Sequence, residues 1–108
     1  MTVLRVCYKS GVRFDHTYYL SKHLPLTAGV MAPYGVKNVE IVKVTTTVDG
    51  SKPPYQVIFS AYFESAGALE KAMQSPRIGE VLGDIQNFYD GMPEVLIGEV
   101  VDLPVPPR

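Results

Sequence analysis

Four stretches of the chain have the apolar, β-branched residues and the alternation that are typical of β-strands. They cover residues 2–9, 36–48, 55–64 and 95–101. In the third of them one face is wholly apolar, with Tyr55, Val57, Phe59, Ala61 and Phe63 at alternate positions. The polar segment 49–54 separates the second stretch from the third and predicts a β-hairpin with a six-residue loop.

Two other regions have the spacing of an amphipathic helix. In the first, Asp15 is a typical N-cap residue and predicts a helix that begins at about His16. One half of that helix is mostly apolar and carries Tyr19, Leu20, His23, Leu24, Leu26, Thr27, Val30 and Met31. Pro25 has no backbone N–H, so the helix either ends near Leu24 or continues with a kink just after His23.

The second helical region follows the strand at residues 55–64. Ser65 is a typical N-cap residue, and Pro76 is suited to the first position of a further helix. Apolar residues recur at helical spacing on both sides of Pro76: Ala66, Leu69, Ala72, Met73, Ile78, Val81, Leu82, Ile85 and Phe88. The turn residues 90–93 end this region before the last strand.

The predicted elements follow one another in the order βαββαβ. This order is typical of the α+β class with a ferredoxin-like arrangement, in which a four-stranded antiparallel sheet carries both helices on one face. The second face of the third strand still carries Ile58 and Tyr62, so we expect it to pack against a second copy and form a dimeric α+β barrel. We expect residues 1–102 to be one domain, and the proline-rich residues 103–108 to be an arm that crosses the partner subunit or is disordered.

Composition excludes several classes of function. The net charge is −1, from ten basic and eleven acidic residues, and no run of Lys or Arg indicates binding to nucleic acid. No apolar stretch is long enough to cross a membrane, and the N-terminal residues do not resemble a signal peptide, so we expect a cytoplasmic protein. Cys7 is the only cysteine, which excludes an internal disulfide and favours a buried reduced thiol. His16 and His23 are seven residues apart, and no Cys or carboxylate completes a familiar ligand spacing, so no metal site is expected. A haem cofactor is not expected either, because the chain is short.

His23 is the main candidate for chemistry, because a titratable ring lies in the middle of an apolar helix face. The unperturbed pKa of histidine is about 6.5, so its imidazole can accept or donate a proton at neutral pH. Tyr19 lies one turn earlier on the same half of the helix and could orient a substrate or donate to a developing oxyanion. Three further aromatic residues are possible walls of an apolar pocket around His23: Phe59, Tyr62 and Phe88. The alternative is a structural histidine whose two nitrogens bond to neighbours in the core.

A segment of the first helix resembles the signature of the EthD family, whose first helix has a similar Tyr-Tyr pair followed by His-x-Pro-Leu. The matching residues are Phe14, Asp15, Tyr18, Tyr19, Lys22, His23, Leu24, Pro25 and Leu26. Residues 75–76, 84–88 and 98–100 also resemble later parts of the family. The resemblance implies a dimeric α+β barrel. Members of that superfamily include cofactor-independent oxygenases, decarboxylases and lactone isomerases that act on aromatic or polyketide-like molecules.

Two hypotheses for the function remain open. In the first, the protein is an enzyme without a cofactor, of the oxidoreductase, lyase or isomerase type, and His23 is the acid or base acting on an aromatic, polyketide-like or xenobiotic substrate. In the second, the domain binds an apolar small molecule or is a non-catalytic accessory subunit of a degradation pathway, and His23 is structural. The two differ in whether a cavity lies between the first helix and the sheet and whether His23 opens into it.

Overall fold

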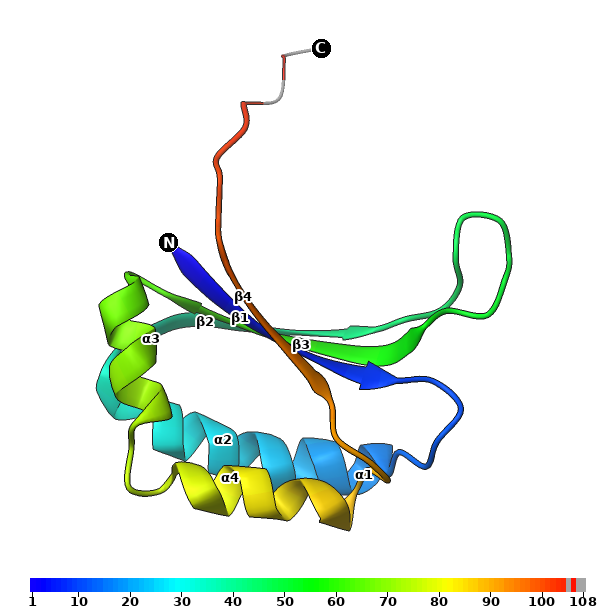
Figure 1. The fold of residues 1–108 in the computed structure, drawn as a ribbon, viewed down its shortest axis with the longest axis horizontal. Helices are drawn as coiled ribbons and strands as arrows, with labels where there is room; N and C mark the ends of the chain where they lie inside the picture. The colour runs from blue at the N-terminus through cyan, green and yellow to red at the C-terminus, as the bar shows by residue number, and fades with distance from the viewer. Residues whose placement is uncertain (105, 107–108) are drawn as a thin grey trace.

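The computed structural model describes residues 1–104 and 106, which form one antiparallel sheet with helices on a single face (Figure 1). The strands are β1 (Thr2–Lys9), β2 (Val36–Lys43), β3 (Tyr55–Phe63) and β4 (Glu94–Glu99). Their order in the sheet is β2-β3-β1-β4, so β1 and β3 are central and β2 and β4 are edges. This is the predicted ferredoxin-like α+β arrangement, and the prediction of the fold class is confirmed.

Two helical regions cover the lower face of the sheet in Figure 1. The first runs without interruption through α1 (His16–Tyr18), η1 (Tyr19–His23), α2 (Leu24–Met31) and η2 (Ala32–Tyr34). The second consists of α3 (Ala66–Met73), α4 (Ile78–Asp84) and η3 (Ile85–Asn87). Helices α2 and α4 lie side by side beneath the sheet, which joins two distant parts of the chain (Figure 1). No helix among the described residues is long and apolar enough to cross a membrane.

Side chains at both predicted N-caps bond to the first turns of their helices. Asp15 Oδ1 accepts a hydrogen bond from the Tyr18 N–H at 3.0 Å, and Ser65 Oγ accepts one from the Ala68 N–H at 3.2 Å. The first helix begins directly after Asp15, as predicted. The first helical region ends at Gly35, whose φ of 73° is a left-handed conformation that glycine adopts without steric cost.

The strand predicted at residues 36–48 is shorter in the structure, because β2 ends at Lys43. Local side-chain hydrogen bonds replace the strand ladder in the loop that follows. The Thr47 hydroxyl donates to Asp49 Oδ1 at 2.7 Å, and the Ser51 N–H donates to the same oxygen at 3.0 Å. The β-branched residues before the loop therefore suggested a longer strand than the hydrogen bonds allow.

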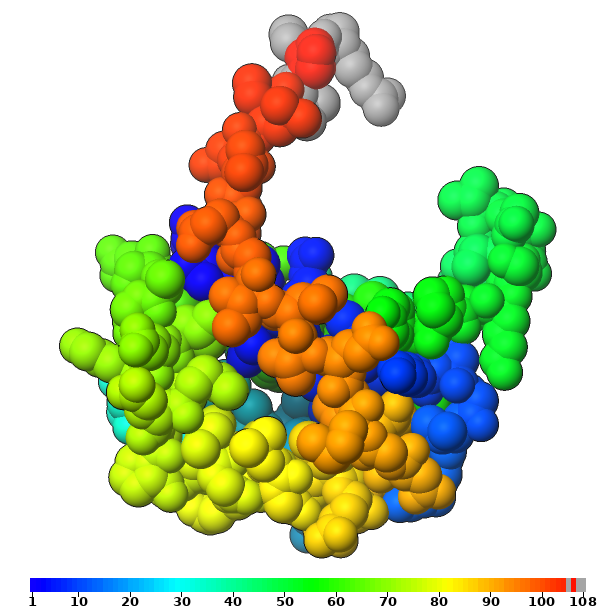
Figure 2. Space-filling view, in the orientation of Figure 1, coloured from blue at the N-terminus to red at the C-terminus, as the bar shows by residue number. Residues whose placement is uncertain are grey.

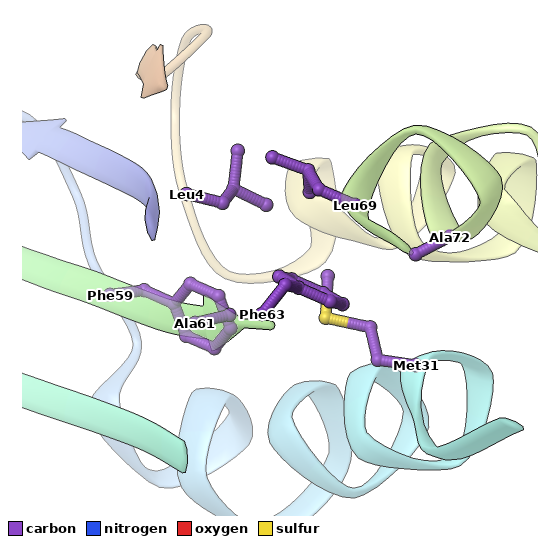
Figure 3. Packing of buried hydrophobic residues seen from close by; sticks show 7 residues of the cluster. All are labelled: Leu4, Met31, Phe59, Ala61, Phe63, Leu69 and Ala72. Atoms are coloured by element: carbon purple, nitrogen blue, oxygen red, sulfur yellow. The ribbon is translucent and has the colours of Figure 1, made fainter. Parts of the chain in front are cut away.

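The core lies between the sheet and the helices and has two parts. One part packs β1 and β3 against α2 and α3 (Figure 3), with Leu4, Met31, Phe59, Ala61, Phe63, Leu69 and Ala72. The other part is mainly aromatic, with Tyr8, Tyr19, Val57, Ile85, Phe88 and Tyr89. The predicted apolar face of β3 supplies residues to both parts, so this is the face that turns toward the helices.

No described element covers the other face of the sheet (Figure 1). Neighbouring strands alone bury Val3 and Cys7 of β1 on this face, and Tyr62 of β3 is half-buried there. Val42 and Leu96 lie on the same face of the edge strands and are exposed. The uncovered face is therefore partly apolar, as the sequence predicted.

The chain leaves the sheet after Glu99, earlier than the predicted residue 101, and the segment that follows rises on the uncovered side (Figure 1). The loop between β2 and β3 rises on the same side (Figure 1). Val101 and Leu103 in the C-terminal segment are exposed. Of the predicted arm, Val105, Pro107 and Arg108 lie outside the described residues.

Replacing Phe63 with alanine should destabilise the fold strongly, because this side chain is fully buried in the core. Loss of a buried phenylalanine side chain costs about 3–5 kcal/mol of the free energy of unfolding. Urea unfolding of Phe63→Ala followed by circular dichroism measures the change. Val48→Ala is the control, because Val48 is fully exposed and its effect should stay within about 0.5 kcal/mol. A loss below about 1 kcal/mol for Phe63→Ala would contradict the packing described.

Candidate active site

His23 is the last residue of η1, a single π-helical turn within the first helical region. In this turn the N–H of Leu24 donates to the carbonyl of Tyr19, a spacing of five residues in place of four. Because Pro25 has no N–H, an α-helix would lose a hydrogen bond here, and the wider turn carries the chain past the missing donor. The sequence left two outcomes open at Pro25. The structure shows that the helix continues past Pro25 and does not end near Leu24. Single π turns inside α-helices are frequent at functional sites.

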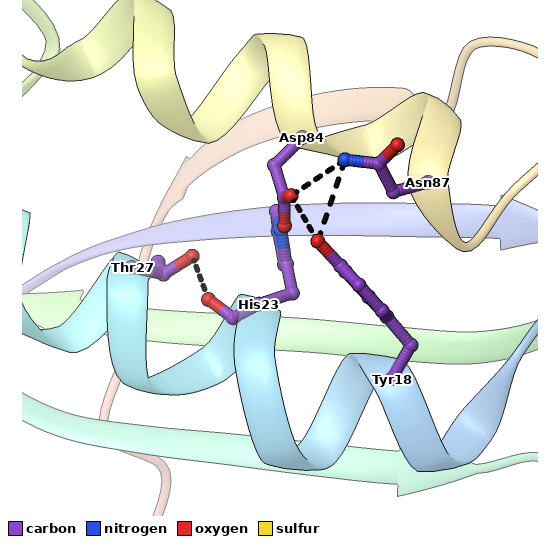
Figure 4. A network of polar contacts seen from close by, with 5 residues as sticks. All are labelled: Tyr18, His23, Thr27, Asp84 and Asn87. Carbon is purple, nitrogen blue, oxygen red and sulfur yellow. Dashed lines mark hydrogen bonds and ion pairs between the residues drawn. The ribbon is translucent and has the colours of Figure 1, made fainter.

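The ring of His23 is buried and bonds to Asp84 of α4 (Figure 4). His23 Nδ1 lies 2.9 Å from Asp84 Oδ2. The other carboxylate oxygen accepts hydrogen bonds from the Tyr18 hydroxyl at 2.6 Å and from Asn87 Nδ2 at 2.9 Å. The Thr27 hydroxyl donates to the His23 carbonyl at 2.9 Å. Asp84 of α4 therefore holds the imidazole, and Thr27 holds the backbone carbonyl of His23.

The carboxylate of Asp84 determines which nitrogen of His23 carries the proton. An ionised carboxylate only accepts hydrogen bonds, so Nδ1 must be the protonated nitrogen of the neutral ring. Nε2 then holds the lone pair, and no hydrogen-bond partner for it is found among the described residues. The neutral ring is therefore prepared to accept a proton at Nε2.

Burial and hydrogen bonds set the protonation states of the site. Burial lowers the pKa of His23 below the usual 6.5, and the hydrogen bond and charge of Asp84 offset only part of that effect. Burial alone would raise the pKa of Asp84, but the hydrogen bonds from its three partners lower that pKa below the usual 3.8. At neutral pH the site holds a neutral His23 beside an ionised Asp84.

A cavity of about 90 Å³ lies between the sheet and the helices, and His23 is part of its wall. Most of the wall consists of apolar side chains from β1, β3, β4, α2 and α4. Its polar members are Tyr8, Tyr19, His23 and Thr27. None of the described residues that line it is Lys, Arg, Asp or Glu. Leu82 and Met92 line the cavity and are also exposed, so they mark its mouth, and Figure 2 shows the surface hollowed between β4 and the helices α3 and α4.

The cavity brings together only part of the predicted set of residues. His23, Tyr19 and Phe59 line it. Phe88 lies behind the wall, fully buried, with its ring centroid 4.4 Å from that of His23. The prediction that Tyr62 is a wall of this pocket is wrong. Side chains alternate along β3, and Phe59 faces the helices, so Tyr62 lies on the uncovered face of the sheet.

Sequence reasoning did not identify Asp84 or Tyr18 as partners of His23. Asp84 comes three residues after Val81, so helical spacing places it next to the apolar face of α4. The sequence could therefore have indicated that this carboxylate lies near the core. Tyr18 lies on the polar half of the first helix, where its role depends on how α4 packs. Only the pairing of the two helical regions brings these side chains together, and no local pattern in the sequence encodes that pairing.

The other residues considered for chemistry lie apart from this network. The ring of His16 packs against Phe14, with 4.7 Å between the ring centroids. Cys7 is a free, buried thiol on the opposite face of the sheet. Within residues 1–104 and 106, no three His, Cys, Asp or Glu side chains gather in the way that a metal site requires.

The fold and the site define a class of small α+β proteins with a ferredoxin-like sheet and a cavity beneath it. A sequence model of the EthD domain matches residues 12–92, which is most of the chain. The chain therefore belongs to the EthD family, and the resemblance seen in the sequence is confirmed. A search of curated proteins finds no match.

Solved structures share this fold over nearly the whole chain. An EthD-like protein from Ralstonia eutropha is 29% identical, with a TM-score of 0.81, and the match covers 94% of this chain and 92% of that one. An ethyl tert-butyl ether D (EthD) family protein from Bacillus halodurans is 20% identical, with a TM-score of 0.77 and coverage of 94% and 99%. SnoaB, a cofactor-independent oxygenase from Streptomyces nogalater, is 13% identical, with a TM-score of 0.68 and coverage of 94% and 93%. The last two likenesses concern the fold alone.

The stability of the protein should depend on pH through His23. The pKa of His23 is lower in the folded chain than the usual 6.5, so between these two values the unfolded chain binds more protons at this residue. Its contribution to the free energy of unfolding should be complete above about pH 6.5 and decrease as the pH falls toward the folded pKa. Urea unfolding across this range should show that His23→Gln lacks this part of the slope.

His16→Gln is the matched control, because His16 is only half-buried and packs against Phe14, apart from Asp84, and this variant should keep the slope of the wild type. The ionisation of Asp84 does not interfere, because its pKa is below 3.8 and its effect on stability falls in a more acidic range. Equal slopes for the wild type and His23→Gln would contradict a neutral, buried His23.

Proposed function

We propose that the chain is an enzyme that works without a cofactor on an aromatic, polyketide-like or xenobiotic substrate, with His23 as its acid or base. One observation carries this proposal: His23 Nδ1 bonds to Asp84 at 2.9 Å while the ring forms part of the wall of an apolar cavity. A histidine whose one nitrogen is bound to a carboxylate has its other nitrogen available as a general base.

The chemistry starts with the neutral imidazole. Nε2 takes a proton from a phenol or from a carbon next to a carbonyl, and the imidazolium that forms is stabilised by the ionised Asp84. The enolate or phenolate left behind is electron-rich. It can react with O₂, as in an oxygenase, or take the proton back at another atom, as in an isomerase. In a decarboxylation, Nε2 would take the proton of the carboxyl group and then return it to the carbon that loses CO₂.

The similarity to SnoaB supports this reaction class only through the fold that the two proteins share. The alternative is a domain that binds a small molecule, or serves as an accessory subunit of a degradation pathway, without catalysis. A cavity whose wall includes a titratable histidine is compatible with both catalysis and binding. Proton transfer from a bound ligand is the property that separates them.

Exchange of hydrogen at the carbon next to a ketone tests catalysis without knowledge of the natural substrate. In D₂O, a base in contact with the uncharged bicyclic ketone 2-tetralone replaces the hydrogens beside its carbonyl with deuterium. The wild-type protein should speed this exchange, and proton NMR follows it. His23→Gln should lose about 100-fold or more of the rate increase, because a general base contributes about 10²–10⁴-fold.

Asp84→Asn should lower the exchange rate by about 10- to 100-fold, which is the loss of activity seen when metal-ligating histidines lose a hydrogen-bonding partner. The amide can donate to Nδ1 and so favours the opposite tautomer. In the wild type the rate should rise with pH and level off, with a midpoint below 6.5, because only the neutral imidazole accepts a proton. Binding of 2-tetralone without faster exchange than in buffer would contradict catalysis and favour the binding alternative.

We also propose that two copies pack through the uncovered faces of their sheets. Apolar side chains on this face lack cover from any described element: Val42, Ile58, Tyr62 and Leu96. The loop between β2 and β3 and the segment after β4 rise beside this face, where they can contact a second copy (Figure 1). A stable interface of this kind buries more than about 1,000 Å² in total.

The double variant Val42→Glu, Leu96→Glu should be a monomer at micromolar concentration, because it would bury unpaired charges in the interface. Analytical ultracentrifugation measures the change. Leu20→Glu is the control: Leu20 is 55% exposed and Leu96 is 54% exposed, but Leu20 lies in the helical layer, so this variant should stay dimeric. A wild-type protein that sediments as a monomer would contradict the dimer.

A further inference from the structure

Among the described residues, the hydroxyl of Tyr19 is the one buried side-chain oxygen or nitrogen that makes no hydrogen bond of normal geometry, although the Tyr8 hydroxyl lies close enough to affect its pKa. Tyr19 is 1% exposed and lines the same cavity as His23. Buried hydroxyls nearly always have a partner, because removal from water without a new hydrogen bond is costly. A missing partner at the wall of a cavity indicates that a ligand supplies it.

Aromatic neighbours fix the ring of Tyr19 on several sides. The ring lies edge-on to Tyr8, with 5.7 Å between centroids, and edge-on to Phe14, with 5.0 Å. It stacks on the ring of His23, with 5.6 Å between centroids and 19° between planes. Because Tyr19 and His23 belong to the same π turn, their rings keep a fixed relation at the cavity wall. This packing uses the ring and does not need the hydroxyl.

The protonation states make Tyr19 a donor and His23 an acceptor. Burial raises the pKa of Tyr19 more than the neighbouring Tyr8 hydroxyl lowers it, so the phenolate of Tyr19 does not form at neutral pH. The neutral His23 has its lone pair on Nε2, because Nδ1–H donates to Asp84. The described residues of the cavity wall include no Lys or Arg that could pair with an anion.

We propose that Tyr19 binds an oxygen atom of the ligand and that, together with His23, it selects uncharged molecules with a phenol, an enol or an enolisable ketone. A phenol or enol oxygen can accept from Tyr19 and donate to Nε2. A ketone oxygen can accept from Tyr19 while the proton on the neighbouring carbon goes to Nε2, and Tyr19 then stabilises the oxyanion that forms. A carboxylate would be disfavoured, because it would lose its water in an apolar cavity that offers no cation, and because its negative charge would face the lone pair of His23. This inference rests on the function proposed for His23 and adds the class of substrate to it.

Binding of three bicyclic probes tests the inference: 2-naphthol, naphthalene and 2-naphthoate. At neutral pH, 2-naphthol should bind about 10-fold tighter than naphthalene, because it makes hydrogen bonds that naphthalene cannot make, and 2-naphthoate should bind more weakly than both. Tyr19→Phe should lower the affinity for 2-naphthol about 3- to 10-fold and leave the affinity for naphthalene unchanged. Tyr34→Phe is the matched control, because Tyr34 does not line this cavity, and it should change neither affinity.

A melting curve of Tyr19→Phe gives a second readout. The variant keeps the ring and loses only a hydroxyl without a partner, so it should melt no earlier than the wild type. Earlier melting would indicate a partner within the chain and would overturn the inference. An unchanged ratio of the two affinities in Tyr19→Phe, or 2-naphthoate binding as tight as that of 2-naphthol, would overturn it as well.

The exchange of 2-tetralone separates this inference from the proposed function. Exchange that depends on His23 but not on Tyr19 would overturn the role of Tyr19 and leave the general base in place. The expected pattern of probe affinities without any exchange would overturn catalysis and leave the ligand class in place.

Discussion

The hydrogen bond between His23 and Asp84 is the interaction on which the site depends. It joins the first helical region to α4, which comes from a distant part of the chain (Figure 4). His23 also forms part of the cavity wall. The hydrogen bond also selects the tautomer of His23 and leaves the lone pair on Nε2. Without Asp84 the imidazole would lose both its fixed orientation and the charge that stabilises its protonated form.

Burial keeps both polar groups of this site, the imidazole of His23 and the hydroxyl of Tyr19, uncharged. It lowers the pKa of His23, which keeps the imidazole unprotonated at neutral pH, and it raises the pKa of Tyr19, which keeps the hydroxyl a donor. Apolar walls without charged residues favour ligands that carry no charge. The same exclusion of water therefore sets the chemistry of the two polar residues and the class of ligand that they can meet.

The cavity and the uncovered face lie on opposite sides of the sheet, so the described site is formed within one chain. A second copy on the uncovered face would not supply the partners of His23. Its role would be to bury the apolar side chains there and to hold the sheet from which β1 and β3 present their residues to the cavity. The proposed assembly and the proposed proton transfer therefore depend on opposite faces of the sheet.

Much of the fold could be predicted from the sequence, because periodicity and caps are local signals. The strand at β1, the N-caps Asp15 and Ser65 and the order of elements all follow from such signals. The position of Tyr62 could not be predicted, because alternation gives two faces but does not say which one meets the helices. The loop after β2 was misjudged because side-chain hydrogen bonds around Asp49 compete with the ladder.

The candidate site was predictable only in part, for a related reason. The place of His23 on an apolar helix face is a local feature, and so is the proline that follows it. The partner of His23 is not local, because Asp84 reaches it only through the packing of α4 on the first helical region. Whether the Tyr19 hydroxyl makes a hydrogen bond likewise depends on the residues packed around it, and no sequence pattern indicates this.

NMR of ¹⁵N-labelled protein tests the central claim most directly, because it reports the tautomer and the protonation of His23. The structure predicts that at neutral pH the ring is neutral with its proton on Nδ1, and that the protonation midpoint lies below 6.5. A ring protonated on Nε2 at neutral pH, or a midpoint above 6.5, would contradict a general base held by Asp84.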